Sequence, residues 1–491
     1  MAEFDTLIKG GMIIDGTRTP RYRGDIAIRD GLIAEIGYID SSRADKVLDA
    51  SGHIVAPGFV DLHTHYDAQV FWDPYCTISG WHGITTVVIG NCGFGFAPVA
   101  PEARERAMLT MTRVEAIPLA SMKAGMPWDW ETFPEFLDSV ERTPKAMNIV
   151  PYVPISPIMV SVMGLADAKA GRMPTDAEHA EMCRLLEQSL QATDTQPKIH
   201  RKVLAWLEHC REQGIRVYGQ GLTTDAGYAF TFEDWNLFDE CPAWRDATLG
   251  SHEERLAKLG DPARRPALRE QIPAFVLGPF EEIVVTGPKS AETRQWLDHT
   301  VGLVAEKTGK HVVDAMLDIV VADNLETEFF SMPPNSRIDY LKEIVDNPYV
   351  LFGVSDGGAH TKFLTAGRYP TETLTKIVRE HGMLSLEDAH WRLSALPAQL
   401  CGCRDRGTLE LGSPADIVVY DYENLEILPP EVVHDLPGNE WRRVQRAKGY
   451  RYILINGEVT IENDQQTNTY SGKLLRHGAA AAEAATAIAA A

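Results

Sequence analysis

The residues best suited to chemistry lie in the segment Asp61-Leu-His63-Thr-His65-Tyr-Asp67. This segment follows the apolar run PGFVDL, which is typical of a buried β-strand, so the histidines stand at the carboxyl end of that strand. Side chains two residues apart in a strand point to the same face, and His63 and His65 can therefore converge on one metal ion. Neutral imidazole suits zinc and similar divalent cations, and Asp61 is placed to orient one of the rings.

A second candidate, Asp356, lies in the segment VSDGGAH, directly after the apolar run YVLFG. A carboxylate at the end of a strand, followed by two glycines, can reach a central site while the backbone turns sharply away. Asp356 can there both contact a metal ion and accept the proton of a water molecule. The alternative is an aspartate that only caps a turn.

A third candidate is Cys92, in the segment Asn91-Cys92-Gly93 that ends the strand-like run ITTVVIG. A nearby cation lowers the pKa of a cysteine and favours its thiolate, which binds metals. A small buried core cysteine is the alternative interpretation.

Two further residues are candidates for substrate binding. Arg368 follows the segment that carries Asp356, and a guanidinium can clamp a substrate carboxylate through two hydrogen bonds. An ordinary salt bridge is the alternative. His82, in SGWHGITT, precedes a strand-like run, where a packed or capping histidine is the alternative to a substrate contact.

The elements that must position these residues alternate along the middle of the chain. Strand-like runs at 53–67, 84–93, 146–157, 215–222 and 349–360 are separated by longer helical patterns. This alternation predicts βα units and a parallel sheet or barrel. We count five or six strands of this kind, fewer than a complete barrel of eight.

Both ends of the chain read as short strands with turn signals. Asp-Gly steps at 15–16 and 30–31 indicate hairpins near the start, and PADIVVYDYENL and RYILINGEVTIEND are strand-like near the end. We therefore expect a small β-sandwich domain from residues 1–56 and 408–475, a βα-barrel domain from 57–407, and an alanine-rich tail at 476–491.

Composition excludes several classes of protein. The 491 residues carry 69 acidic and 47 basic side chains, a net charge of −22, which argues against binding to nucleic acid or anionic lipid. We see no signal peptide and no apolar run near the roughly 20 residues that span a bilayer. Seven scattered cysteines suit a reducing compartment, so we expect a cytoplasmic protein. The sequence leaves open whether the chain forms a homo-oligomer. Phosphate-loop, nucleophile-elbow and dinucleotide-binding patterns are absent from the sequence.

These segments, in this order, resemble the amidohydrolase superfamily, and within it the N-acyl-D-amino-acid deacylase (D-aminoacylase) branch. The most specific pieces are PGFVDLHTHYD, GNCGFGFAP, and SDGGAH followed by GRYPTETL. The similarity runs from KGGMIIDG near the start to ILINGEVT near the end, which is nearly the whole chain. It implies a (β/α)8-type, TIM-like barrel with a divalent metal, zinc, held by His63, His65, Asp356 and Cys92.

The chain also departs from this branch. Deacylases of this kind supply two further histidines from middle barrel strands, and we find no strand that bears them between 185 and 206. His200, the histidine nearest to this interval, reads as the start of a helix. We therefore expect one metal ion rather than two, and an incomplete or distorted barrel.

The resulting expectation is a metal-dependent amidohydrolase that cleaves an amide-type C–N bond of a small substrate, such as an N-acyl-(D-)amino acid. Two alternatives stay open: a related hydrolase of lactones or cyclic imides, or a metal-dependent decarboxylase, and a catalytically silent binding protein that keeps the fold.

Overall fold

The computed structural model describes residues 2–175, 177–178, 182, 200–215, 217–224, 227–233, 238, 241–271, 279–331 and 338–476. The chain divides into two compact units. Unit 1 comprises Met1–Thr224, Leu341–Thr361 and Thr365–Ala491, and unit 2 comprises Asp225–Tyr340 and Lys362–Leu364. The interval in which we expected only barrel elements thus also holds unit 2.

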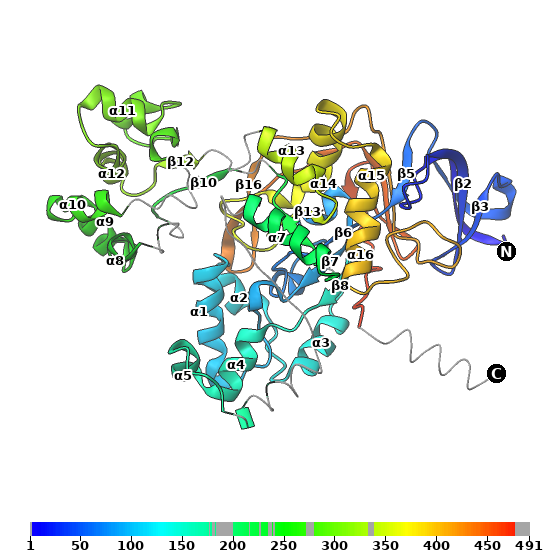
Figure 1. The fold of residues 1–491 in the computed structure, drawn as a ribbon, viewed down its shortest axis with the longest axis horizontal. Coiled ribbons are helices and arrows are strands. Elements are labelled where there is room, and N and C mark those ends of the chain that lie inside the picture. Colours follow the sequence, from blue (N-terminus) through cyan, green and yellow to red (C-terminus); the bar gives the residue numbers. More distant parts are fainter. Residues whose placement is uncertain are drawn as a thin grey trace. The chain divides into compact units, whose positions relative to one another are not determined.

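Unit 1 contains a nine-stranded sheet built from both ends of the chain (Figure 1). Its order is β21-β20-β19-β14-β5-β1-β2-β3, and β4 pairs with β1. The ends meet where β5 pairs antiparallel with β14, Pro57 opposite Ile417. Its strands are β1 (Phe4–Ile13), β2 (Tyr22–Arg29), β3 (Leu32–Gly37), β4 (Ala44–Asp49), β5 (Ile54–Pro57), β14 (Ile417–Tyr420), β19 (Tyr450–Ile455), β20 (Glu458–Glu462) and β21 (Gln465–Gln466).

The turn signals near the start had different outcomes. Asp30 and Gly31 form a two-residue connection between β2 and β3, and both have positive φ, 53° and 77°, as a tight hairpin requires. The step at 15–16 begins a longer connection between β1 and β2, in which Asp15 accepts hydrogen bonds from the backbone and hydroxyl of Thr17.

Five short parallel strands carry the candidate site. They are β6 (Phe59–Asp61), β7 (Ile84–Ile89), β8 (Asn148–Pro151), β9 (Gly219–Gly221) and β13 (Val350–Phe352). The first three form one sheet, β13 pairs with β9, and a parallel bridge from Thr64 to Gly357 joins the two groups. All five predicted strand runs of the middle of the chain thus contain a strand. Every residue of β6 and β7 is buried, as in a central parallel sheet.

Helices surround these strands, and several carry clear start signals. Thr132 and Glu135 form a reciprocal capping box at the start of α3. The α-helices outside unit 2 are α1 (Arg104–Val114), α2 (Leu119–Gly125), α3 (Phe133–Arg142), α4 (Ile155–Met163), α5 (Leu165–Lys169), α7 (His200–Glu212), α14 (Tyr369–Glu372), α15 (Leu386–His390), α16 (Leu396–Leu400) and, across the unit boundary, α13 (Ile338–Asp346). π-helical segments continue two of them, at Thr373–Glu380 and Trp391–Ala395.

Two small strand pairs complete unit 1. β15 (Glu426–Ile427) pairs with β18 (Ala447–Lys448), and β16 (Glu431–Leu436) forms an antiparallel hairpin with β17 (Glu440–Val444). Arg476, the last described residue, binds Asp138 and Glu141. The rest of the predicted alanine-rich tail lies outside the described residues.

Among its described residues, unit 2 combines an antiparallel sheet with α-helices (Figure 1). The sheet has the order β10-β12-β11. Its elements are β10 (Tyr228–Phe230), β11 (Val284–Gly287), β12 (Glu328–Ser331), α8 (Pro242–Thr248), α9 (His252–Gly260), α10 (Arg265–Glu270), α11 (Val301–Thr308) and α12 (Val312–Ala322). The centre of this unit is aromatic, with Phe238 stacked on Trp244 at 4.5 Å between ring centroids. None of the described helices of either unit is long and apolar enough to cross a membrane.

Candidate metal centre

The H-x-H segment leaves β6 in an extended path that is fixed on both sides. On one side Thr64 Oγ1 donates a hydrogen bond to the carbonyl of Val88, at 2.6 Å. On the other side the backbone N–H of His65 donates to the carbonyl of Gly357, also at 2.6 Å. The chain between the two histidines is thus held between β7 and the turn after β13. As a result both imidazoles face the same region, with ring centroids 5.6 Å apart.

Asp356 reaches these rings from a turn that depends on glycine. Its own φ is +50°, and Gly358 follows with a φ of +90°. A Cβ on Gly358 would lie 2.6 Å from the carbonyl oxygen of His65, so only glycine allows this close approach. Asp356 Oδ1 lies 3.5 Å from Nε2 of His63 and 3.5 Å from Nε2 of His65.

Cys92 joins the two histidines from the turn after β7. Its φ of +53° is unusual for a residue with a side chain, and such backbone conformations cluster at functional sites. The Cys92 Sγ lies 3.3 Å from Nε2 of His63. One ligand atom each from His63, His65 and Cys92 fit within 4.8 Å of one another. Cys92 is also exposed, unlike the small core cysteine that was the alternative.

The residue that orients the ring of His63 is Gln220, not Asp61. Gln220 extends from β9, and its Oε1 accepts a hydrogen bond from Nδ1 of His63 at 3.0 Å. Asp61 instead accepts a hydrogen bond from the backbone N–H of His63 at 3.1 Å. An acceptor at Nδ1 favours the tautomer whose Nε2 lone pair is available to a metal. The sequence offered no signal for Gln220 beyond its place at a predicted strand.

Two further residues of the cluster escaped the sequence analysis. The Glu115 carboxylate follows helix α1 and lies 3.5 Å from Nε2 of His65 and 3.8 Å from Nε2 of His360. His360 ends the SDGGAH segment. Neither spacing nor strand position marks Glu115 in the sequence, because it comes from a helix end and meets His65 only through the tertiary fold.

The electrostatics of the cluster favour opposite charges side by side. Burial alone would raise the pKa of Asp356, but its contact with His65 and the charge of the neighbouring histidines outweigh burial and hold the pKa well below its usual range. Burial also acts to raise the pKa of Cys92, and contacts with both histidines lower it to about 6. For His63, burial lowers the pKa and the contacts with Cys92 and Asp356 raise it to about 9. Positive charge is therefore stabilised among these groups.

The donor set fits a zinc-type cation. Imidazole nitrogen, thiolate sulfur and carboxylate oxygen are the ligands that Zn²⁺ takes in proteins. His65 is 1% exposed, and neither of its ring nitrogens has a hydrogen-bond partner among the described residues. Buried polar atoms of this kind need an explanation, and a metal ion at Nε2 supplies one for that nitrogen.

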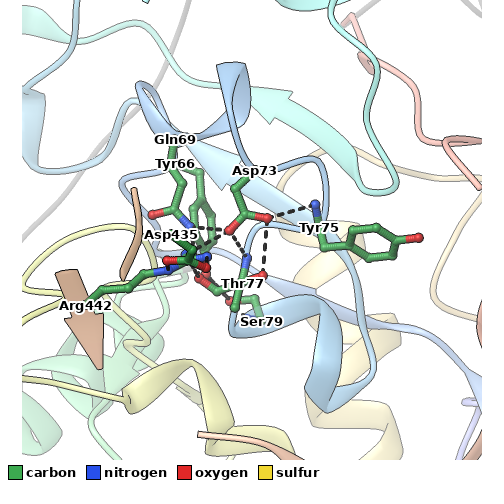
Figure 2. A network of polar contacts seen from close by, with 8 residues as sticks. All are labelled: Tyr66, Gln69, Asp73, Tyr75, Thr77, Ser79, Asp435 and Arg442. Carbon is green, nitrogen blue, oxygen red and sulfur yellow. Dashed lines mark hydrogen bonds and ion pairs between the residues drawn. The ribbon is translucent and has the colours of Figure 1, made fainter. Parts of the chain in front are cut away.

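The loop that leaves the H-x-H segment is anchored by a buried ion pair (Figure 2). The Asp73 carboxylate accepts hydrogen bonds from the backbone N–H groups of Tyr75 and Thr77. Arg442, 4% exposed on β17, donates to Asp73 at 2.8 Å and to both oxygens of Asp435. The hairpin of β16 and β17 thereby fixes the loop that begins one residue after His65.

Arg368 and His82 lie in a second network, around Gln445. Arg368 donates from Nε to Glu372 at 3.2 Å and from Nη1 to the side chain of Gln445 at 2.7 Å. His82 is fully buried, with Nδ1 2.8 Å from Thr371 Oγ1 and Nε2 3.0 Å from the carbonyl of Gln445. Burial lowers the pKa of His82 to about 4, so its ring is neutral. The structure therefore gives His82 a packing role, and a substrate contact by either residue stays a prediction.

The interval without the expected histidines is described only in part. Residues 185–199 lie outside the described residues. His200 begins helix α7, as predicted. In the next strand, β9, the side chain that meets the cluster is Gln220, the middle residue, rather than a histidine.

Comparison with known proteins gives a consistent set of relatives. The model of the amidohydrolase family matches residues 46–238 and 297–461. The D-aminoacylase of Alcaligenes xylosoxydans is 27% identical over 97% of this chain and 98% of its own. The N-acyl-D-aspartate deacylase of the same organism is 26% identical over 97% of this chain and 96% of its own.

A solved structure shows the same fold. It is that of the N-acyl-D-glutamate deacylase of Bordetella bronchiseptica, in complex with zinc and a phosphonate inhibitor that mimics the tetrahedral intermediate of the reaction. The match has a TM-score of 0.64 at 23% sequence identity and covers 96% of this chain and 100% of the deacylase chain.

Proposed function

Because this chain belongs to the amidohydrolase family, we propose that it is a metal-dependent hydrolase that cleaves the amide bond of an N-acyl-D-amino acid. The resemblance found in the motifs is confirmed by the two Alcaligenes deacylases, each of which aligns with 97% of this chain. One observation carries the proposal. Nε2 of His63 and Nε2 of His65 both lie 3.5 Å from the same oxygen of Asp356, at the carboxyl ends of neighbouring parallel strands.

We assign the metal site to His63, His65, Asp356 and Cys92, and we propose one zinc ion. A bound divalent cation would polarise the amide carbonyl and lower the pKa of a water molecule toward neutrality. The sulfur and nitrogen donors favour zinc over magnesium or calcium, which prefer oxygen.

Asp356 is the proposed proton carrier. Its side chain is 28% exposed, whereas that of His65 is 1% exposed, so solvent reaches the carboxylate. Its low pKa keeps it ionised and able to accept the proton of the attacking water. The same carboxylate can then return that proton to the nitrogen of the departing amino acid, which completes the hydrolysis without a second acid.

His63 depends on Gln220 for this chemistry. The hydrogen bond at Nδ1 holds the ring so that Nε2 faces Asp356 and Cys92. Arg368 is the candidate for binding the substrate carboxylate, although Glu372 and Gln445 already contact its guanidinium. A substrate carboxylate would have to share these donors.

For the architecture we propose a (β/α)8-type barrel in which the five parallel strands form one arc. The similarity of this chain to the zinc-bound deacylase, with a TM-score of 0.64 between the two structures, supports this proposal. The cytoplasmic location stays a prediction, and the sequence leaves open whether the chain forms a homo-oligomer.

The function is tested by assaying the purified protein with N-acetyl-D-amino acids, N-acetyl-L-amino acids, cyclic imides and lactones. We expect release of a free D-amino acid that stops when the metal is chelated and resumes when zinc is added. Asp356→Asn should lower the rate about 10²- to 10⁴-fold, since it removes the proton acceptor. Turnover of ring substrates alone, or turnover that a chelator leaves unchanged, would contradict the proposal.

A further inference from the structure

Glu115 is tied through its backbone to the turn that carries Asp356. Its N–H donates to the carbonyl of Met111 at 2.9 Å and so closes the last turn of helix α1. Its carbonyl accepts a hydrogen bond from the N–H of His360 at 2.7 Å. The position of Glu115 is therefore fixed by both a helix end and the metal-site turn.

The carboxylate of Glu115 is buried, and its ion-pair neighbours are imidazoles. Its side chain is 5% exposed, and its ion-pair neighbours are His65 at 3.5 Å and His360 at 3.8 Å. No lysine or arginine pairs with it in the part of the chain that the structure describes. A buried carboxylate without a fixed positive partner is unfavourable by several kcal/mol.

The same region already holds two other anionic donors. The Asp356 carboxylate lies 3.5 Å from Nε2 of both histidines, and the Cys92 sulfur lies 3.3 Å from Nε2 of His63. A divalent cation is the partner that would balance three such groups, since buried charges in proteins are paired or coordinate metals. The buried Nε2 of His65 has no hydrogen-bond partner among the described residues, and it lies 3.5 Å from each of the Glu115 and Asp356 carboxylates.

The distances have the spacing of a coordination shell. Donor atoms of a five-coordinate zinc ion, with bonds of about 2.1 Å, are separated by roughly 3.0–3.6 Å when they lie next to one another. Nε2 of His65 lies 3.5 Å from the Glu115 carboxylate and 3.5 Å from that of Asp356. Nε2 of His63 lies 3.5 Å from Asp356 and 3.3 Å from the Cys92 sulfur. The contact of Glu115 thus matches those of the assigned ligands.

We propose that Glu115 is a further ligand of the metal ion and binds it from the closed side of the site. This inference rests on the proposed function. The closed side is defined by His65 and Glu115, which are 1% and 5% exposed, and the open side by Asp356 at 28% and by the exposed Cys92. Glu115 then adds a donor on the closed side, and the open side is left for water and substrate.

The test measures zinc binding rather than turnover. Zinc affinity is determined by competition with a chromophoric chelator for the wild type, Glu115→Gln and Glu115→Asp. We expect Glu115→Gln to weaken zinc binding at least tenfold, and Glu115→Asp, which keeps a carboxylate, to fall between the two. Glu105→Gln is the matched control. Glu105 lies on helix α1, which Glu115 follows, and its side chain is 67% exposed and pairs with Lys123. The zinc affinity of the Glu105→Gln protein should therefore equal that of the wild type.

Cobalt substitution gives a second readout. Loss of an oxygen ligand should change the visible absorption spectrum of the cobalt form in Glu115→Gln but not in Glu105→Gln. Far-ultraviolet circular dichroism of the chelated proteins checks that each variant folds.

The outcomes separate this inference from the proposed function. Equal zinc affinity and equal cobalt spectra in Glu115→Gln and wild type overturn the ligand assignment while the hydrolase proposal stands. Unchanged zinc affinity with lost turnover also overturns the ligand assignment, because Glu115 would then take part in proton transfer and not in metal binding. A wild type that binds no zinc refutes the proposed function and this inference together.

Discussion

The two imidazoles of the H-x-H pair are held in different ways. His63 is oriented through its ring by Gln220, whereas neither ring nitrogen of His65 has a hydrogen-bond partner within the described part of the chain. The position of His65 comes instead from its backbone, which donates to Gly357. The metal should therefore depend on Gln220 through His63 alone.

Replacing Gln220 by leucine should weaken zinc binding about tenfold, the lower end of the effect typical of residues that orient metal ligands. Leucine keeps the approximate size of the side chain but removes the acceptor at Nδ1. Gln220→Glu, which keeps an acceptor, should retain most of the affinity. The control is Gln213→Leu, because Gln213 is an exposed glutamine that directly follows helix α7, outside strand β9. A Gln220→Leu protein with wild-type zinc affinity would show that the ring of His63 needs no such support.

Residue types and spacing were enough to predict four side chains that the structure brings together, but not their partners. The H-x-H pair, Asp356 and Cys92 stand at strand ends, where the sequence pattern points to a common edge. Gln220 and Glu115 carry no such mark. A glutamine and a glutamate of this kind occur on any surface, and only the tertiary fold brings them to the histidines.

At the scale of elements, short strands are positioned by long-range contacts between loops and hairpins. The hairpin of β16 and β17 sends Arg442 into the loop that follows the H-x-H segment, where it meets Asp73 (Figure 2). The sequence predicted strand-like runs on both sides of this hairpin but not the hairpin itself. EVVHDL is largely exposed, and EWRRV buries an arginine, Arg442, so neither strand shows the apolar alternation that marks a half-buried strand.

Removing Arg442 should destabilise the protein strongly. Arg442→Ala leaves the carboxylate of Asp73 buried without its cation, a change that typically lowers the free energy of unfolding by about 3–5 kcal/mol. Lys448→Ala is the control, because Lys448 and its partner Glu426 are 61% and 48% exposed and such pairs contribute at most about 1 kcal/mol. Urea denaturation of both variants measures the difference. Equal shifts of the two denaturation midpoints would mean that the buried pair has no special role.

In the molecule as a whole, the sequence patterns predicted that the two chain ends pair with each other. They did not predict that a second compact unit exists. The strand-like ends meet in one sheet through β5 and β14. Asp225–Tyr340 forms a compact unit of its own, yet its helices and short strands alternate along the chain much as βα units do. Local patterns report the type of an element but not which distant element it packs against, so this division was not visible in the sequence.

The central claim is that His63, His65 and Asp356 bind a single divalent cation at the carboxyl ends of the parallel strands. The most direct measurement is the anomalous difference density of a crystal of the zinc-loaded protein, collected at the zinc absorption edge. We predict one peak, about 2.0–2.2 Å from Nε2 of both histidines and from an oxygen of Asp356. A peak bonded to other residues, or no peak among these three side chains, would contradict the claim.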